Sequence, residues 1–225
     1  MSKLTLFYNI ASPPARFAVV TASHLGLDVD LKSVNLGEGE QFKPEYLAIN
    51  PAGTVPALLD GDLMISDSSA ISIYLVDKYA NDDSLYPKDP VKRAKVNEKL
   101  FYIAGTVFQT GTLIIFPVIF GSSTEINQDV VKKFDRIFKT IETFLSETKF
   151  IAGDSLTLPD LFLWSLLESA TRLIPCDPER WKNTMGWLER MREHPSNEFM
   201  QKGADFHISA FNSCLERNKK AQNKK

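Results

Sequence analysis

A serine stands directly before two prolines where the first apolar run of the chain ends, in the stretch FYNIASPPAR. Ser12 suits the N-cap of a helix and Pro13 suits its first position, because the following apolar residues recur at helical spacing. The same position also suits a hydroxyl that faces an anionic ligand, because a helix N-terminus favours negative charge. From these residues alone helix capping is the simpler interpretation, and a ligand-binding role for Ser12 is the alternative.

A second candidate site is the stretch SDSSAI, in which Asp67, Ser68 and Ser69 separate an apolar run from a helical pattern. Asp67 and Ser68 suit helix capping. An acidic residue here can also balance an ammonium group while the helix start binds a carboxylate. No metal site or disulfide framework is expected, because the three histidines and two cysteines show no such spacing.

The elements that must position these residues come in two sets. Residues 1–80 alternate strand-like and helical patterns, with strands expected at 3–8 and 28–36, helices at 13–26 and 68–80, a helical turn at 44–49 and a hairpin around Asp60-Gly61. This order predicts a small mixed sheet with helices on its faces. Residues 81–90 are polar and contain two prolines, as expected of a linker.

Long helical patterns occupy residues 91–225. One apolar stripe steps by four, three, four and four residues through Val130, Phe134, Ile137, Ile141 and Leu145. Thr157 and Asp160 form a capping pair that opens another helix. Two more helices are expected at 178–193 and 195–217, so the second half is predicted to be all-helical.

Composition and charge narrow the class of protein. The net charge of −2 argues against nucleic acid as a partner, and the lysines from about residue 216 are interpreted as a solvated tail. The N-terminus lacks a signal-peptide pattern, which predicts a cytoplasmic protein. Residues 100–121 carry no charge and match a membrane span in length, but their polar residues and glycine and proline breaks favour a buried central helix and no membrane.

This organisation, with SPP at the first strand-to-helix turn, resembles that of the cytosolic glutathione S-transferases. The segment NPAGTVPALLDGDLMISDSSAISIYLVDKY is similar to their glutathione-binding segment, and FIAGDSLTLPDL is similar to the capping motif of their sixth helix. SPPAR, VNLGEGEQFKPEYLAINP and LPD are similar to the insect delta and epsilon classes, or to an insect class outside those two. The resemblance extends to about residue 211. It implies an α/β plus all-α architecture, with an N-terminal thioredoxin-like βαβαββα domain at 1–80 and an all-helical substrate domain at 91–225.

The resemblance implies an enzyme that uses glutathione as a co-substrate, with no cofactor. In that family the proline of TVP is cis, and glutathione joins the free sheet edge at Val55 as a short extra strand. From the residues alone an ordinary trans proline is the alternative. The implied glutathione-binding residues are Gln41, Gly53, Thr54, Val55, Pro56, Asp67, Ser68 and Ser69.

Ser12 is then the implied catalytic residue. The first turn has no cysteine, so the reacting thiol must be the substrate's own. Lowering a thiol pKa of about 8.5 by about two units requires about 2.7 kcal/mol. A hydrogen bond to a charged group supplies about 1.5–3 kcal/mol, and a helix N-terminus about 0.3–1 kcal/mol. Tyr8 is the rival to Ser12, because other transferase classes use a tyrosine near this strand end; we expect it to pack beside the site.

The implied hydrophobic substrate site consists of Tyr8, Phe108, Thr112, Phe116 and Phe120. The last four are spaced four apart and share a helix face, so a core role is the alternative. The absence of charge indicates neutral, hydrophobic electrophiles, as in xenobiotic detoxification. The resemblance also implies a homodimer that joins the first domain of one subunit to the helical domain of the other.

Some positions depart from the delta and epsilon pattern. Gln41 and Gly53 stand where histidines are usual, Asp67 replaces a glutamate, and Ser69 replaces a basic residue. A lost hydrogen bond to a charged ligand costs about 1.5–3 kcal/mol, which predicts weaker glutathione binding than usual. These departures leave two alternatives open, a non-catalytic or weakly catalytic carrier of hydrophobic ligands and a glutathione-dependent peroxidase side activity.

Overall fold

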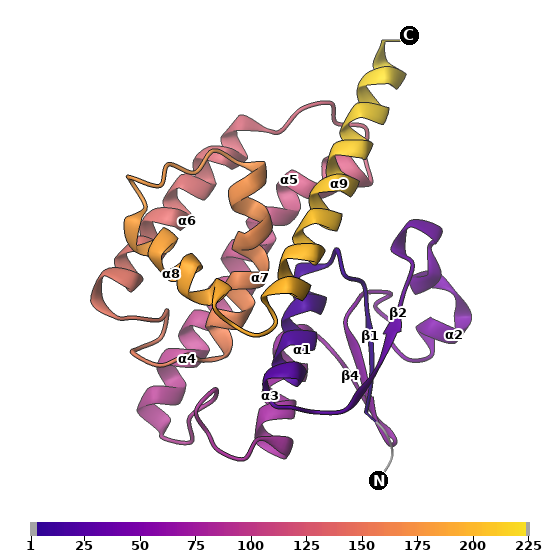
Figure 1. Cartoon of the computed structure of the whole chain (residues 1–225). Coiled ribbons are helices and arrows are strands. Elements are labelled where there is room, and N and C mark those ends of the chain that lie inside the picture. Colours follow the sequence, from indigo (N-terminus) through magenta and orange to yellow (C-terminus); the bar gives the residue numbers. More distant parts are fainter. Residues whose placement is uncertain (1–3, 224–225) are drawn as a thin grey trace.

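The computed structural model describes residues 4–223 and has two halves (Figure 1). The N-terminal half consists of β1 (Leu4–Tyr8), α1 (Pro13–His24), β2 (Val29–Ser33), two short 3-10 turns (Leu36–Glu38 and Glu40–Phe42), α2 (Pro44–Leu47), β3 (Ala57–Asp60), β4 (Leu63–Ser66) and α3 (Ser68–Tyr79). The C-terminal half consists of α4 (Pro90–Tyr102), a π-helical segment (Ile103–Phe108), α5 (Gln109–Ile119), α6 (Gln128–Glu147), α7 (Leu158–Leu173), α8 (Lys182–Arg192) and α9 (Asn197–Gln222).

The four strands form one mixed sheet in the order β2-β1-β3-β4, in which β1 runs parallel to β2 and antiparallel to β3. One face of the sheet packs against α1 and α3 through a cluster that includes Leu6, Val19 and Ile71. The other face packs against α2, where Tyr46 contacts Phe7 edge to face at 5.8 Å between ring centroids. Figure 1 shows α2 and the α1–α3 pair on opposite sides of the sheet. The predicted thioredoxin-like order and all-helical second half are confirmed.

The periodic signals of the helical half are also confirmed. The stripe on α6 is buried at every predicted position, from Val130 to Leu145. At the start of α7, Oδ2 of Asp160 accepts hydrogen bonds from the backbone N–H and the hydroxyl of Thr157, both at 3.0 Å, which is the predicted capping pair. Oδ1 of the same carboxylate accepts from the indole of Trp187 and the N–H of Ile151, so the cap also joins α7 to α8 and to the loop before α7.

Two helix boundaries in this half were predicted wrongly. Residues 178–181 form a turn and α8 begins only at Lys182, where the carboxylate of Glu142 accepts from the N–H groups of Asn183 and Thr184. The last helix continues to Gln222, so the lysines at 219 and 220 are helical and not part of a frayed tail. Lys219 pairs with Glu216 at 3.1 Å. The tail residues Lys224 and Lys225, and Lys3 of the predicted first strand, lie outside the described residues.

The uncharged segment at 100–121 is buried on one face only. Within residues 4–223, the helical span Pro90–Ile119 is the one helix long and apolar enough to cross a membrane by length and composition, and 22% of its most apolar window is buried. Leu100, Ile103 and Val118 lie in the core, whereas Phe101 and Phe116 are exposed. The prediction of a buried central helix therefore holds for its inner face, and the outer face is free for other contacts.

The two halves share one core across their junction. Phe17 of α1 is fully buried and stacks on Phe162 of α7 at 4.8 Å between ring centroids. In the connection between α3 and α4, Leu85 and Tyr86 are buried, and the carbonyl of Leu85 accepts from the N–H of Leu158. The connection is therefore anchored on the helical half. The domain limits at 80 and 91 stay a prediction.

Candidate functional site

Strand register brings the three sequence motifs to one end of the sheet. Phe7 of β1 is opposite Ala57 of β3, and Ala57 is opposite Ser66 of β4. The Ser12 turn follows β1, the Val55-Pro56 bond precedes β3, and Asp67 follows β4. All three therefore lie at the same end of the sheet, although they are up to 55 residues apart in sequence. This end of the sheet is the candidate site, and we call it the candidate edge.

Ser12 is the N-cap of α1, but its hydroxyl is only loosely engaged. Its Oγ accepts from the N–H of Ala15 at 3.4 Å, which is long for a hydrogen bond. Its own N–H donates to the carbonyl of Asn9 at 3.0 Å. Among residues 4–223 the hydroxyl proton has no acceptor. Ser12 therefore serves as a cap and keeps a donor that can face an anion at the helix start.

The Val55-Pro56 peptide bond is cis, which agrees with the resemblance and not with the trans alternative. The loop before it is held by two donors that reach the carbonyl of Thr54: the hydroxyl of Tyr46 at 2.6 Å and the side-chain amide of Asn50 at 2.7 Å. Asn50 is fully buried, and burial raises the pKa of Tyr46 to about 12. The backbone next to Val55 is thus fixed by groups that stay neutral and bonded across the physiological pH range.

Asp67 is the N-cap of α3 and holds the only positive φ, 104°, of a non-glycine residue among those described. Its Oδ1 accepts from the N–H groups of Ser69 and Ala70, both at 2.9 Å. Ser68 is buried, and the Oγ of Ser69 is buried without a partner among residues 4–223. The exposed carboxylate of Asp67, on a strained backbone at the start of α3, and the unsatisfied hydroxyl of Ser69 can together bind both ends of an amino acid group.

Gln41 and Gly53 are neighbours in the loops that precede the cis peptide bond. Gln41 is buried, and its Oε1 has no partner among the described residues, so it retains an acceptor for a ligand. Gly53 has φ +60°, and a Cβ there would lie 3.0 Å from the ring of Phe42 and 3.3 Å from the carbonyl oxygen of Gln41. The neighbouring Phe42 ring, 64% exposed, thus borders the space that a side chain at position 53 would occupy. No pattern in the sequence points to Phe42.

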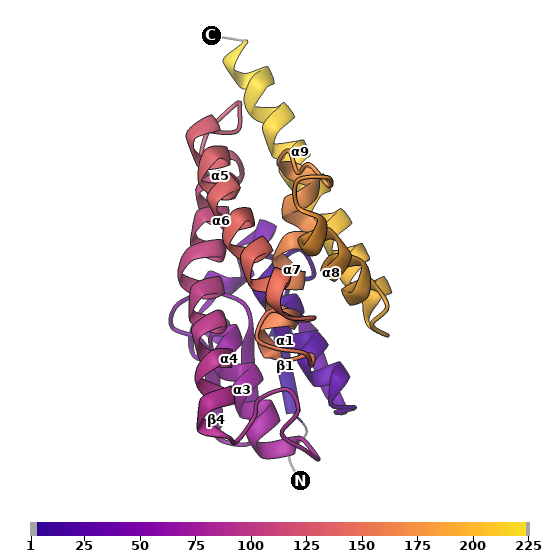
Figure 2. The same cartoon turned by 90° about the vertical axis from the view of Figure 1, so that its left-hand side faces the viewer.

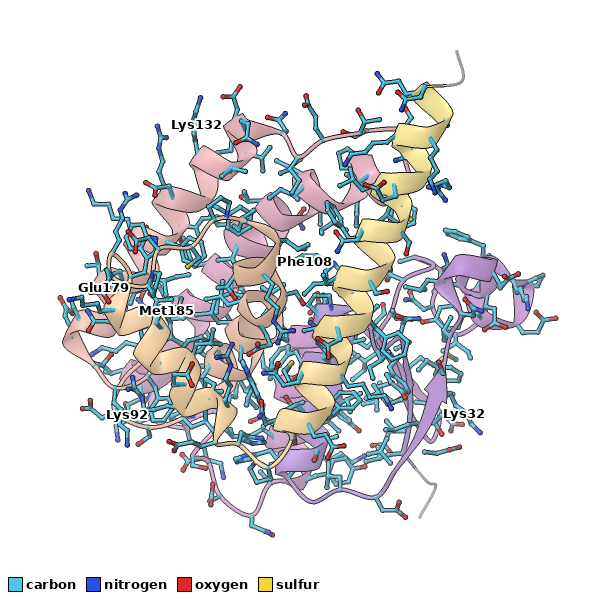
Figure 3. All side chains as sticks on the ribbon, turned by 45° about the horizontal axis from the view of Figure 1, so that its top comes forward. Lys32, Lys92, Phe108, Lys132, Glu179 and Met185 are labelled. Atoms are coloured by element: carbon cyan, nitrogen blue, oxygen red, sulfur yellow. The ribbon has the colours of Figure 1, made fainter. Side chains whose placement is uncertain are left out.

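The predicted hydrophobic residues of the long helix are buried to different extents. Phe108 ends the π-helical segment and packs partly against the core, and Figure 3 shows it in the interior of the view, while Lys132 and Glu179 reach outward at the rim. Phe116 and Phe120 are exposed and contact each other edge to face at 5.2 Å between centroids. A π-helical turn often accompanies a functional site.

Two further predicted residues have specific contacts. The hydroxyl of Thr112 donates to the carbonyl of Gln109, so it faces its own helix. Tyr8, half-buried, packs against Phe199 of α9 at 6.3 Å between ring centroids. Tyr8 thus lies beside α9, and no hydrogen bond joins it to Ser12 among the described residues. Exposed aromatic side chains on this face favour a binding surface over a core role for Phe116 and Phe120.

Two cavities lie away from this edge. One of about 130 Å³ is lined by His24, Leu25, Ala80, Asn81, Asp82, Ser84 and Leu85. Another of about 390 Å³, between α6 and the α7–α8 loop, is lined by Gln128, Val131, Lys132, Phe134, Asp135, Phe138, Pro175, Asp177, Arg180 and Trp181.

In the described part of the chain no three His, Cys, Asp or Glu side chains gather closely enough to hold a metal ion. The chemistry of the candidate edge is therefore that of hydroxyl, amide and carboxylate groups.

Both halves of the chain match known family models. Residues 2–77 match the model described as glutathione S-transferase, N-terminal domain, and residues 106–195 match glutathione S-transferase, C-terminal domain. The matches cover the candidate edge and the long helix from its π-helical segment onward.

Solved structures agree with both matches over nearly the whole length. An epsilon-class glutathione S-transferase from the housefly Musca domestica is 36% identical, with a TM-score of 0.91 over 94% of this chain and 98% of that chain. A glutathione transferase homologue from Drosophila mojavensis, solved with bound glutathione, is 37% identical, with a TM-score of 0.88 over 95% and 98%. A delta-class glutathione transferase from Nilaparvata lugens is 33% identical, with a TM-score of 0.88 over 94% and 99%.

Proposed function

Because the chain belongs to the glutathione S-transferase family and is a glutathione transferase, we propose that it joins the glutathione thiolate to neutral, hydrophobic electrophiles, with Ser12 stabilising the thiolate. The observation that carries the proposal is the free donor of Ser12 at the N-terminus of α1, at the same sheet edge as the cis-Pro56 backbone and Asp67. The thiolate attacks an electrophilic carbon, the leaving group departs with the electron pair, and the product is a thioether.

The roles of the other residues follow from the groups they offer. The backbone of Val55 pairs with the cysteinyl unit of glutathione, and the Tyr46 and Asn50 bonds to the neighbouring Thr54 carbonyl fix that backbone in place. Asp67 balances the ammonium group, and the helix start with Ser68 and Ser69 binds the γ-glutamyl carboxylate. Gln41 faces the glycyl end. The thiol-activating step needs no general base, because the hydroxyl bond and helix start supply enough free energy.

The hydrophobic electrophile is proposed to lie against Tyr8, Phe108, Thr112, Phe116 and Phe120. Support comes from the exposed aromatic rings at 116 and 120 and from the absence of charge along α5. Such a surface favours aromatic and long-chain electrophiles, and detoxification of foreign compounds in the cytoplasm is the proposed setting.

Substitution of Ser12 by alanine tests the assignment directly. Removing one hydrogen bond to an anion, worth about 1.5–3 kcal/mol, raises the pKa of the bound thiol by about one to two units. The measurement is the ultraviolet absorbance of the thiolate in the saturated glutathione complex as a function of pH. Tyr8→Phe is the matched control and leaves that pKa in place. A thiol pKa in Ser12→Ala that is unchanged from the wild type, with a raised pKa in Tyr8→Phe, would overturn the assignment.

A carrier of hydrophobic ligands is the second candidate, and Gly53 favours it. Gly53 has no side chain and so offers no side-chain donor to the glutathione site, and its φ of +60° makes a larger residue there strained. Turnover of an aromatic halide in the presence of glutathione separates the two. Tight binding of hydrophobic ligands without conjugation of any electrophile supports the carrier. A hydroperoxide assay on the same preparation tests the peroxidase side activity.

We also propose a homodimer. Large apolar side chains are exposed on both halves, with Leu63 and Met64 on β4 and Val91 and Phe101 on α4. An interface that joins the first half of one subunit to the helical half of another buries residues of both sets.

A further inference from the structure

Arg16 is a charged residue that is completely buried at the junction of the two halves. Its Nη1 donates to the carbonyls of Ile10 at 3.0 Å and Ala11 at 3.3 Å. Its Nη2 donates to the carbonyl of Ser165 at 2.7 Å and to the Oγ of Ser169 at 3.0 Å. One planar guanidinium therefore connects the turn before Ser12 to the middle of α7, about 150 residues away in sequence.

The connection depends on the shape of the guanidinium, whose two terminal nitrogens, Nη1 and Nη2, form a planar fork. Two nitrogens of a guanidinium can bond two partners on each side at once, whereas the single ammonium of a lysine cannot reach both sides. The two carbonyls on the near side belong to the two residues directly before Ser12. Any change in the position of the fork is thus transmitted to the backbone that carries the Ser12 hydroxyl.

Helix α9 packs closely against the contact between Arg16 and the carbonyl of Ile10. A Cβ at Gly203 would lie 2.3 Å from Cδ of Arg16 and 2.7 Å from the carbonyl oxygen of Ile10, distances that real side chains do not reach. Gly203 is buried in the interior of a helix, where glycine costs about 1 kcal/mol relative to alanine. This glycine allows α9 to approach both Arg16 and the carbonyl that Arg16 binds.

The Ser12 side chain has little else to fix it. Its capping bond to the N–H of Ala15 is 3.4 Å long. The direction of the hydroxyl therefore depends on the backbone of residues 10–12, and two carbonyls of that backbone are held by Arg16.

Among residues 4–223, no carboxylate is bonded to Arg16. Burial lowers the pKa of Arg16 to about 9, so it remains a cation at neutral pH. Its four direct partners are neutral oxygens. The nearby Glu168 is already bonded to Arg172 at 2.7 Å and Arg192 at 2.9 Å. The buried cation is thus held by geometry and not by an ion pair, which is costly unless the position serves a purpose.

We propose that Arg16 is a positioning residue for Ser12, and that it uses the helical half of the chain as the rigid support that aims the hydroxyl at the glutathione sulfur. The inference rests on the proposed role of Ser12. It makes the pKa of the bound thiol depend on contacts of α7 and α9 that touch neither glutathione nor the electrophile.

Arg16→Lys keeps the charge and loses the two-sided fork, and Gly203→Ala displaces the same contact from α9. We expect each to raise the pKa of the bound thiol by about half a unit to one unit, which leaves about three- to tenfold less thiolate below that pKa. We expect kcat/KM for the electrophile to fall by a similar factor. Ser169→Ala removes only one bond of the fork, so its shift is smaller. The readout is the thiolate absorbance titration of each purified, folded variant saturated with glutathione.

Gly186→Ala is the matched control. Gly186 lies in α8, where a Cβ would have only the far end of Arg190 within 4 Å, at 3.9 Å, so this variant keeps the wild-type thiol pKa. Arg16→Met separates charge from geometry. If Arg16→Met raises the pKa and Arg16→Lys does not, the field of the cation is responsible and the positioning role is refuted.

Reduced stability without a pKa shift in Arg16→Lys and Gly203→Ala also refutes the proposal, because it leaves Arg16 a purely structural tie. If Ser12→Ala itself leaves the thiol pKa unchanged, the proposed function fails and the inference fails with it. A shift in Ser12→Ala without one in the Arg16 and Gly203 variants rejects the inference alone.

Discussion

The Nδ1 atom of His24 lies 2.9 Å from the Nε2 atom of His194 and so joins the end of α1 to the loop before α9. Nδ1 of His194 accepts from the N–H of Ser196 at 3.1 Å, so the proton of a neutral His194 is on Nε2 and is donated to His24. Both imidazoles must be neutral for this chain of bonds. Burial and the neighbouring His24 lower the pKa of His194 to about 4, and burial lowers that of His24 despite the nearby Asp82.

This pair predicts a loss of stability in mild acid. The unfolded pKa of a histidine is about 6.5, so between about pH 6.5 and 4 the unfolded chain binds more protons and the free energy of unfolding falls as the pH falls. With a discount for the half-exposed site, the His194 share is about 1 kcal/mol between pH 7 and 5. His194→Asn should therefore lose less stability than the wild type over that range in urea unfolding.

The free energy of unfolding of His194→Asn must be compared with that of the wild type at each pH, because other groups also titrate in this range. Burial raises the pKa of Asp160 to about 6, which acts in the opposite direction over part of the window, and it lowers that of His207 to about 4, which acts in the same direction. Both groups are present in both proteins and cancel. Equal pH slopes would show that the pair does not titrate with folding.

Substitution of Asp160 by asparagine should destabilise the helical half. The carboxylate accepts four hydrogen bonds from Ile151, Thr157 and Trp187, and the NH₂ group of an asparagine would face donors in place of an acceptor. We expect the free energy of unfolding to fall by about 2–4 kcal/mol. The exposed Asp154→Asn in the preceding loop is the control and should stay within about 0.5 kcal/mol. Equal stabilities of the two variants would contradict the bonding pattern.

The proposed dimer predicts a shift to monomers in Phe101→Glu. This side chain is 69% exposed on α4, and burying a carboxylate without a partner in an apolar interface is costly. Sedimentation at several protein concentrations measures the change. Phe206→Glu is the control, because Phe206 is 52% exposed on α9, which lies on the opposite side of the molecule from α4 (Figure 2). A wild-type chain that sediments as a monomer at all concentrations refutes the proposal.

Features that depend only on residues close together in the sequence could be predicted from the sequence. The Ser12 and Asp67 caps, the Thr157–Asp160 pair, the β3–β4 hairpin and the buried stripe of α6 each depend on groups a few residues apart, so propensity and spacing are enough to predict them. The start of α8 was missed because Glu142, which bonds the first N–H groups of that helix, comes from α6.

The candidate edge needed more than local signals. The roles of Gln41, Gly53 and the cis-Pro56 segment came from resemblance to a family, because nothing in isolated glutamine, glycine or Val-Pro residues indicates a ligand. Phe42 escaped notice for the same reason: an exposed phenylalanine is ordinary until the neighbouring Gly53 backbone is known.

By itself, the sequence determined the order of the elements, the helix starts and the two-part organisation, because these depend on short-range hydrogen bonds and on periodic burial. Only the tertiary structure decided that Arg16 bonds Ser165, that His24 meets His194, and that the long apolar helix is buried on one face. The two pairwise contacts join residues 149 and 170 positions apart, and burial of one face depends on what covers it, so these features exist only once the partners have been placed by the rest of the fold.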